Sequence, residues 1–128
     1  MAAEKAPTRA TTAAVDIRDN FCCVLCGRAI DGGSRHHRQL RRHGDHSPAN
    51  IVLLCGSGTT GCHGWVHAHP AASYAQGWLV HSWHAPELVP LPTAGRHGPV
   101  WAFHTRSGLR TTMTTTCALH ALDELGLG

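Results

Sequence analysis

Cysteines and histidines are concentrated in one short part of this chain, and they limit the folds it can adopt more than any other feature. The 46 residues from Cys22 to His67 hold five of the six cysteines and six of the twelve histidines. Thiolate and imidazole groups are the ligands that proteins use for zinc and related metals. A chain with this cluster is expected to fold around bound metal, and the first question is how many ions the segment holds.

Two cysteine pairs predict a first metal site. Cys23 and Cys26 are separated by two residues, the spacing at which one turn presents two thiolates to a tetrahedral ion. Cys55 and Cys62 form a wider pair across the flexible stretch "GSGTTG". Four sulfurs are typical of structural zinc, whereas a redox role for the first pair would leave the second pair unexplained. Cys22 is an alternative ligand to Cys23, with a wider gap to Cys26.

Composition agrees with a small, loop-rich domain stabilised by metal. Glycine and proline together make up 21 of the 128 residues (14 and 7), and chains of this kind often need a bound ion. The length predicts one domain over residues 16–128, after a disordered Ala/Thr-rich lead-in over residues 1–15. Within that domain we expect the motif-bearing core over residues 21–85 and an extension over residues 86–128. The net charge of +3 permits a nucleic-acid partner without requiring one.

Hydropathy gives no sign of a membrane protein. The first twenty residues contain no apolar run of signal-peptide length, and no uninterrupted hydrophobic stretch is long enough to span a bilayer. We therefore expect a cytoplasmic protein, in which cysteines are more often metal ligands than disulfides.

The local patterns predict alternating short strands and helices. Residues 35–42 read as an extended segment, residues 51–55 as a buried strand, and residues 62–69 as a helix. Pro70 can open a further helical turn that stops at Gly77. Residues 78–83 and 100–105 read as strands, and residues 117–125 have weak helical periodicity.

The histidines that four cysteines would not use predict a second metal site. His63 and His67 lie four residues apart, so on a helix their imidazoles share one face and can hold one metal. His36 and His37 are adjacent, so in a strand they point to opposite sides and suit two roles, a ligand and a group facing the substrate. The amide of Asn50 can hold the intervening loop and hydrogen-bond a histidine.

This order of residues resembles the HNH endonuclease family. The resemblance runs from Cys23 to His67, is carried by His-His, then Asn, then Cys-His-x-x-x-His between cysteine pairs, and is closest to small phage-type and bacterial members. It implies an α+β fold with a ββα-metal core, a zinc knuckle and short C-terminal strands. It also implies that His37 is the general base and that Asn50 orients the loop. A catalytic divalent cation (Mg²⁺, Mn²⁺, Ni²⁺ or Zn²⁺) would be bound by His36, His63 and His67.

The activity implied by the resemblance is metal-dependent hydrolysis of DNA phosphodiester bonds, by nicking or by double-strand cleavage. Nothing in the sequence resembles a base-reading module, so we expect low sequence specificity. An arginine run beside the histidines is expected to contact phosphates and consists of Arg35, Arg38, Arg41 and Arg42. The resemblance further implies the cytosol of a bacterial or phage-infected cell, with a homodimer or a DNA-packaging machine as partner.

One alternative class of function fits part of the pattern. A non-catalytic zinc-ribbon adaptor would use the cysteines for folding and the arginines for DNA or protein contact. It would make His37 dispensable, and it gives no reason for the spacing of His63 and His67.

Two further features bear on the site. The pair Asp45-His46 is similar to the Asp-His dyad of many HNH relatives, but only three residues separate His46 from Asn50, too few for the loop between two strands, so we leave the pair out of the site. The tryptophans Trp65, Trp78 and Trp83 are expected to pack in the core rather than to stack on bases.

Overall fold

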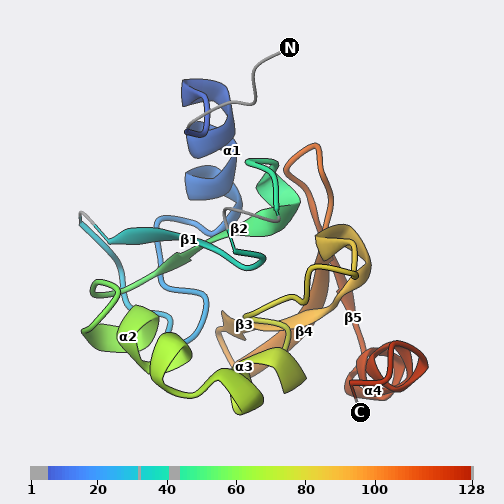
Figure 1. The fold of residues 1–128 in the computed structure, drawn as a ribbon. Helices are drawn as coiled ribbons and strands as arrows, with labels where there is room; N and C mark the ends of the chain where they lie inside the picture. The colour runs from blue at the N-terminus through green and yellow to red at the C-terminus, as the bar shows by residue number, and fades with distance from the viewer. Residues whose placement is uncertain (1–5, 32, 41–43, 128) are drawn as a thin grey trace.

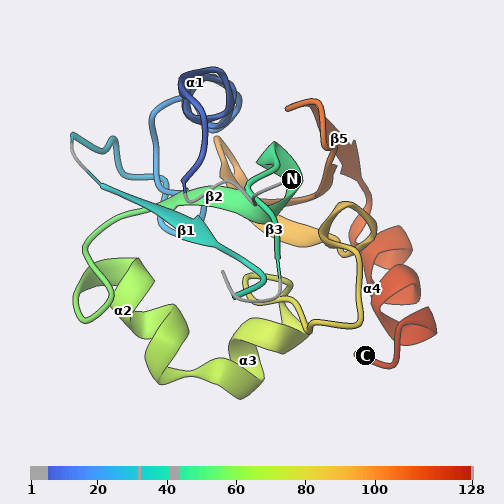
Figure 2. The same cartoon turned by 45° about the horizontal axis from the view of Figure 1, so that its top comes forward.

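The computed structural model describes residues 6–31, 33–40 and 44–127, which form a mixed α/β structure with small sheets. Its α-helices are α1 (Arg9–Arg18), α2 (Gly61–Ala68), α3 (Pro70–Ala75) and α4 (Thr115–Glu124). Its strands are β1 (Ser34–His37), β2 (Ile51–Leu54), β3 (Leu91–Gly95), β4 (Gly98–His104) and β5 (Arg110–Met113). Short 3-10 turns lie at Pro48–Asn50 and Pro86–Leu88. Figures 1 and 2 show α2 and α3 on one side of the β1–β2 pair and α1 on the other.

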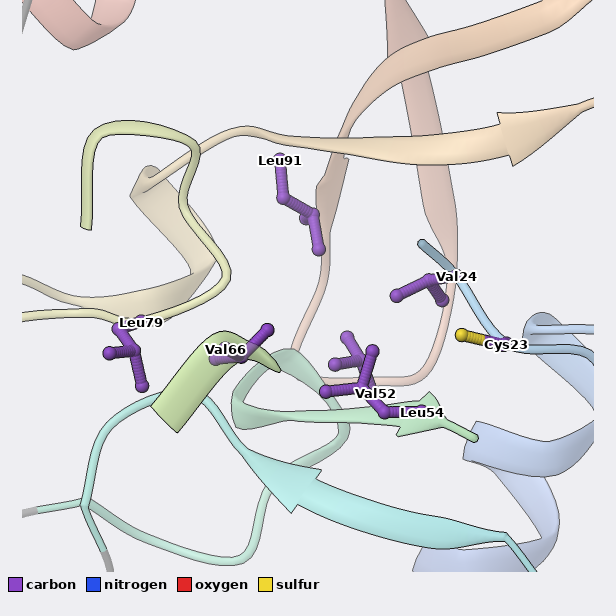
Figure 3. Packing of buried hydrophobic residues seen from close by; sticks show 7 residues of the cluster. All are labelled: Cys23, Val24, Val52, Leu54, Val66, Leu79 and Leu91. Carbon is purple, nitrogen blue, oxygen red and sulfur yellow. The ribbon is translucent and has the colours of Figure 1, made fainter. Parts of the chain in front are cut away.

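The first sheet pairs β1 with β2 in antiparallel register, with His36 opposite Val52 and His37 opposite Ile51. All four residues of β2 are buried, which confirms the strand predicted from its β-branched, apolar composition. Helix α2 follows β2 and lays Val66 against this strand. Figure 3 shows the resulting cluster of buried side chains, which consists of Cys23, Val24, Val52, Leu54, Val66, Leu79 and Leu91.

The second sheet has the order β3-β4-β5 and is antiparallel throughout. Trp101 of β4 packs with Ala118 and Leu122 of α4, which gives the C-terminal part its own apolar cluster. The strand predicted over residues 100–105 lies mostly within β4. Strand β3 was not predicted because its Pro/Gly-rich surroundings hide the signal, although Leu91 is fully buried.

Two predicted features differ from the structure. Residues 9–18 form helix α1 where a disordered lead-in through residue 15 was expected; Thr8 caps the helix by accepting from Thr11 N, and Val15 is buried with Ile51. Residues 1–5 lie outside the described residues. The strand predicted over residues 78–83 is irregular instead. The backbone N–H groups of Trp78 and Leu79 donate to Ser73 O in α3, and only Val80 N donates toward β1, to Arg38 O at 2.8 Å.

The tryptophans also divide in a way that the sequence did not predict. Trp78 is half-buried and packs against the main cluster, but Trp65 is 40% and Trp83 73% exposed, so the expectation that these two pack in the core is wrong. Within the part of the chain that the structure describes, no helix is long and apolar enough to cross a membrane.

Candidate metal centres

Four thiols from three parts of the chain converge on one point. Cys23 and Cys26 come from the turn between α1 and β1, Cys55 follows β2, and Cys62 lies in the first turn of α2. Their Sγ atoms all lie within 4.8 Å of one another, and Cys26 Sγ is 3.8 Å from Cys55 Sγ. A tetrahedron with Zn–S bonds of about 2.3 Å has edges of about 3.8 Å. The cluster therefore fits a metal ion such as zinc.

The structure also shows how the wide Cys55–Cys62 spacing closes. Residues 56–61 fold back on themselves, with Ser57 and Thr60 bonded through their backbones, and His63 N donates to Cys55 O at 3.0 Å. Gly61 has a φ of +61°, and a Cβ there would lie 2.7 Å from Cys55 O, so the turn requires glycine. Between the two candidates at the first position, Cys23 joins the cluster, whereas the backbone of Cys22 pairs with Ala29.

Protonation of the thiols depends on their surroundings. The hydrogen bond from Cys62 N to Cys55 Sγ, 3.4 Å long, lowers the pKa of the Cys55 thiol. Burial raises the pKa of the thiols of Cys23 and Cys62. A divalent ion in the centre would displace these protons because only the thiolate binds metal.

Three imidazoles form a second cluster a short distance along the same helix. His36 of β1 and the pair His63 and His67 of α2 place one ligand nitrogen each within 4.8 Å of the others. Nε2 of His67 lies 3.1 Å from Nε2 of His63, and the His36 ring centroid is 5.0 Å from that of His63. The structure thus brings together the three histidines for which the sequence predicted a shared site.

The position of His36 is set by a backbone carbonyl. Its Nε2 lies 2.8 Å from Trp78 O, and because a carbonyl only accepts, Nε2 carries the proton and Nδ1 keeps its lone pair. The residue is 2% exposed, and burial lowers the pKa of His36 to about 3. Burial also lowers the pKa of His63. His36 and His63 are therefore neutral near pH 7, which is the state that binds a divalent cation.

An open hollow of about 350 Å³ lies beside the imidazole cluster. Its lining residues are Arg35, His36, His37, Leu40, His63 and His67. A site with three protein ligands and an open side has room for water and substrate, unlike a closed four-ligand site. The two adjacent histidines of β1 both border this hollow.

His46 is a site residue that sequence reasoning missed. Its Nδ1 lies 2.9 Å from Nε2 of His37, with the ring planes 78° apart. Such a bond needs one protonated and one unprotonated nitrogen, so the tautomers of His37 and His46 are coupled. The Asp-His similarity is the only signal for His46 in the sequence. The short following segment argues against it there, but residues 44–47 reach His37 without forming a regular strand.

Asn50 holds the loop that carries His46. Its Oδ1 accepts from Gln39 N at 2.7 Å, and its Nδ2 donates to Asp45 O at 2.8 Å and to Gln39 O at 3.3 Å. The side chain is fully buried, so these bonds are shielded from water. The amide therefore fastens the start and the end of the loop to each other. Among the described residues its hydrogen bonds go to Gln39 and Asp45 and not, as the sequence suggested, to a histidine.

The predicted phosphate-contacting arginines fall into three groups. Arg35 is exposed beside the hollow and pairs with Asp16 at 2.6 Å. Arg38 is fully buried, so its assignment to the DNA-contacting surface is wrong. Its guanidinium instead donates to four backbone carbonyls, those of Gly77, Ala49, Pro86 and Val89. Arg41 and Arg42 lie outside the described residues.

Comparison with known proteins adds no family assignment. No family model matches the chain, and neither a curated protein nor a solved structure is significantly similar to it.

Proposed function

We propose that this protein is a metal-dependent endonuclease of HNH type that hydrolyses phosphodiester bonds of DNA with low sequence specificity. The observation that carries the proposal is the convergence of three imidazoles on one edge of an open hollow that a fourth histidine, His37, also lines. A lone histidine is usually structural, but four from β1 and α2 in one open site match the needs of phosphodiester hydrolysis.

The order of elements supports the same proposal. The chain runs from strand β1 through the loop fastened by Asn50 to strand β2 and then helix α2. The histidines proposed as ligands lie on the first strand and on the helix. This is the arrangement that a ββα-metal core requires. The thiol cluster would hold a structural zinc ion that fixes the start of α2 relative to the turn carrying Cys26.

His37 would act on the attacking water. As a neutral imidazole it would take the proton on Nδ1, with Nε2 donating to Nδ1 of His46, and this hydrogen bond would hold the ring in one orientation. A positioned base of this kind contributes about 10²–10⁴-fold to the rate. A divalent cation on His36, His63 and His67 would supply Lewis-acid stabilisation of the phosphate and the leaving oxygen.

Binding of DNA would rest on phosphate contacts around the hollow. Arg35 is the described arginine that borders it, and Arg41 and Arg42 belong to the same predicted run. Double-strand cutting needs two active sites, so a homodimer or a packaging-machinery partner would decide between nicking and cleavage.

The test is a supercoiled-plasmid assay with the zinc-loaded protein in Mg²⁺, Mn²⁺, Ni²⁺ or Zn²⁺, in which one metal is expected to support nicking. His37→Ala should lower the nicking rate by at least about 100-fold with unchanged zinc content and circular dichroism. The matched control is His97→Ala, because His97 is exposed in the β3–β4 turn.

A plasmid that stays intact in every metal would rule out the proposal. If the same protein still binds DNA, the zinc-ribbon adaptor takes its place. Nicking that survives His37→Ala at the wild-type rate would instead remove His37 as the base.

A further inference from the structure

Three aromatic rings, from α3 and the segment that follows it, form a continuous stack. The rings of Tyr74 and His81 are parallel, with centroids 3.9 Å apart and an interplanar angle of 1°. Trp83 stacks on His81 at 4.4 Å and 6°. Tyr74 belongs to α3, and the other two rings lie on the irregular segment that follows it.

The outer ring of this stack faces solvent. Trp83 is 73% exposed, although one of its faces is covered by His81, so the opposite face of the indole is open. Its remaining ring neighbour, His84, lies at a centroid distance of 5.8 Å and a tilt of 58° and does not continue the stack. The stack therefore ends in a large, pre-ordered aromatic surface with no further parallel ring among the described residues.

Hydrogen bonds fasten this stack to the end of β1. Gln39 Nε2 donates to His81 O at 2.8 Å and to His84 O at 2.9 Å, which holds both sides of the turn containing Trp83. Two residues before Gln39 lies His37, and the same segment supplies Trp78 O to His36. The segment that carries the stack is thus held to the histidine-bearing segment by hydrogen bonds from the side chains of His36 and Gln39.

We infer that the open face of Trp83 is a stacking site for an unpaired nucleobase of DNA. Every base has a flat π-face, and an aromatic ring that is already ordered by two others binds it with little loss of side-chain freedom. The inference rests on the proposed function, which it deepens: the substrate would be a single strand, or a duplex locally opened beside the scissile phosphate.

The experiment measures binding rather than cutting. The zinc-loaded full chain carrying His37→Ala is titrated into a fluorescently labelled oligothymidylate and into a matched strand of the same length in which the bases are replaced by abasic sites. Adding Trp83→Ala is expected to weaken binding of the oligothymidylate by about tenfold, since base–aromatic stacking contributes about 1–3 kcal/mol per base. Affinity for the abasic strand, which keeps the phosphates, should not change.

Two variants separate stacking from other effects. Trp83→Phe should restore most of the affinity and remove the part of the tryptophan fluorescence quenching that stacking of a base on Trp83 is expected to cause. Leu109→Ala removes another exposed apolar side chain, in the β4–β5 turn, and should leave binding unchanged. Equal oligothymidylate affinity with and without Trp83, or an equal loss on the abasic strand, would overturn the inference.

The outcome does not depend on nuclease activity. Trp83-dependent binding by a protein that never nicks plasmid would refute the proposed nuclease and leave the stacking site intact. Metal-dependent nicking together with Trp83-independent binding would support the nuclease and refute the stacking site.

Discussion

The two clusters on α2 use neighbouring residues, Cys62 and His63, yet they differ in what holds them together. The four sulfurs come from loops and a helix start, and they are close enough to share one ion. The imidazoles sit on elements that hydrogen bonds already fix: Trp78 O holds His36, and the guanidinium of Arg38 binds the carbonyls beneath it. The sulfur cluster should depend on its metal for folding, whereas the imidazole cluster should be preformed and depend on its metal for chemistry only.

The largest effect on stability is expected at the sulfur cluster. Cys26→Ser should unfold the protein, because apparent binding free energies of structural zinc, about 10–16 kcal/mol, match or exceed the usual net stability of about 5–15 kcal/mol. Circular dichroism and zinc release on denaturation measure the effect. Cys117→Ser is the control, since Cys117 is an exposed thiol outside the cluster. A folded, zinc-free Cys26→Ser protein would break the comparison.

The next effect tests whether hydrogen bonds support the imidazole cluster. Arg38→Met should lower the free energy of unfolding by about 3–5 kcal/mol, because it leaves four buried carbonyls without their donor. Arg35→Met, three residues earlier in β1, is the matched control and should cost at most about 1 kcal/mol, since its ion pair with Asp16 is partly exposed to water. Urea denaturation measures both variants, and similar losses would mean that Arg38 has no special supporting role.

A smaller change should separate metal affinity from stability. His67→Ala should weaken binding of Mn²⁺ or Ni²⁺ to the zinc-loaded protein by about 100-fold or more, while the melting temperature stays within a few degrees of the wild type. Isothermal titration calorimetry and a thermal melt give the two numbers. His69→Ala, at an exposed position two residues further along, should bind the ion normally. Loss of folding in His67→Ala would show that the imidazole cluster, too, needs its ion.

The smallest effect sets the acid limit of the scaffold outside both clusters. His104 is fully buried and accepts from Arg110 Nε at 3.0 Å, and burial moves its pKa far below the usual value of about 6.5. Below about pH 6.5 the imidazole of His104 is protonated in the unfolded chain but stays neutral in the folded protein. The free energy of unfolding therefore falls by about 1.4 kcal/mol per pH unit as the pH decreases below about 6.5.

His104→Gln keeps an acceptor for Arg110 and should show a shallower decline in stability than the wild type between about pH 6.5 and pH 5.5. Urea denaturation at the two pH values measures the slope, and the exposed His97→Gln is the control. An identical slope in wild type and His104→Gln would place the acid sensitivity in the clusters instead.

The sequence predicted those features whose signal is local. The apolar run of β2, the helical spacing of His63 and His67, and the short Cys23–Cys26 gap each depend on a few neighbouring residues, and the structure has all three. The three-histidine convergence was also predictable, because residue type and spacing together restrict the geometry.

The remaining features depend on contacts between distant segments. Arg38 reads as one more member of a basic run, and its burial is decided by carbonyls 11 to 51 residues away. Residues 78–83 have strand-like composition, but their backbone groups bond to Arg38 O and to the side chain of Gln39 instead of forming a strand ladder. The position of His46 depends on a loop conformation that Asn50 fixes. The exposure of Trp83 depends on the turn that Gln39 holds. Apart from the Asp45-His46 pair, these contacts have no signal in the local sequence pattern.

The adjacency of Cys62 and His63 at the beginning of α2 has a consequence for the living cell. When zinc is scarce, the thiols would no longer fix the N-terminus of this helix. His63 and His67 would then move away from His36 on β1. If the chain is the proposed nuclease, hydrolysis would then require the zinc ion as well as the catalytic cation. A newly made chain would stay inactive until its four thiols had acquired metal.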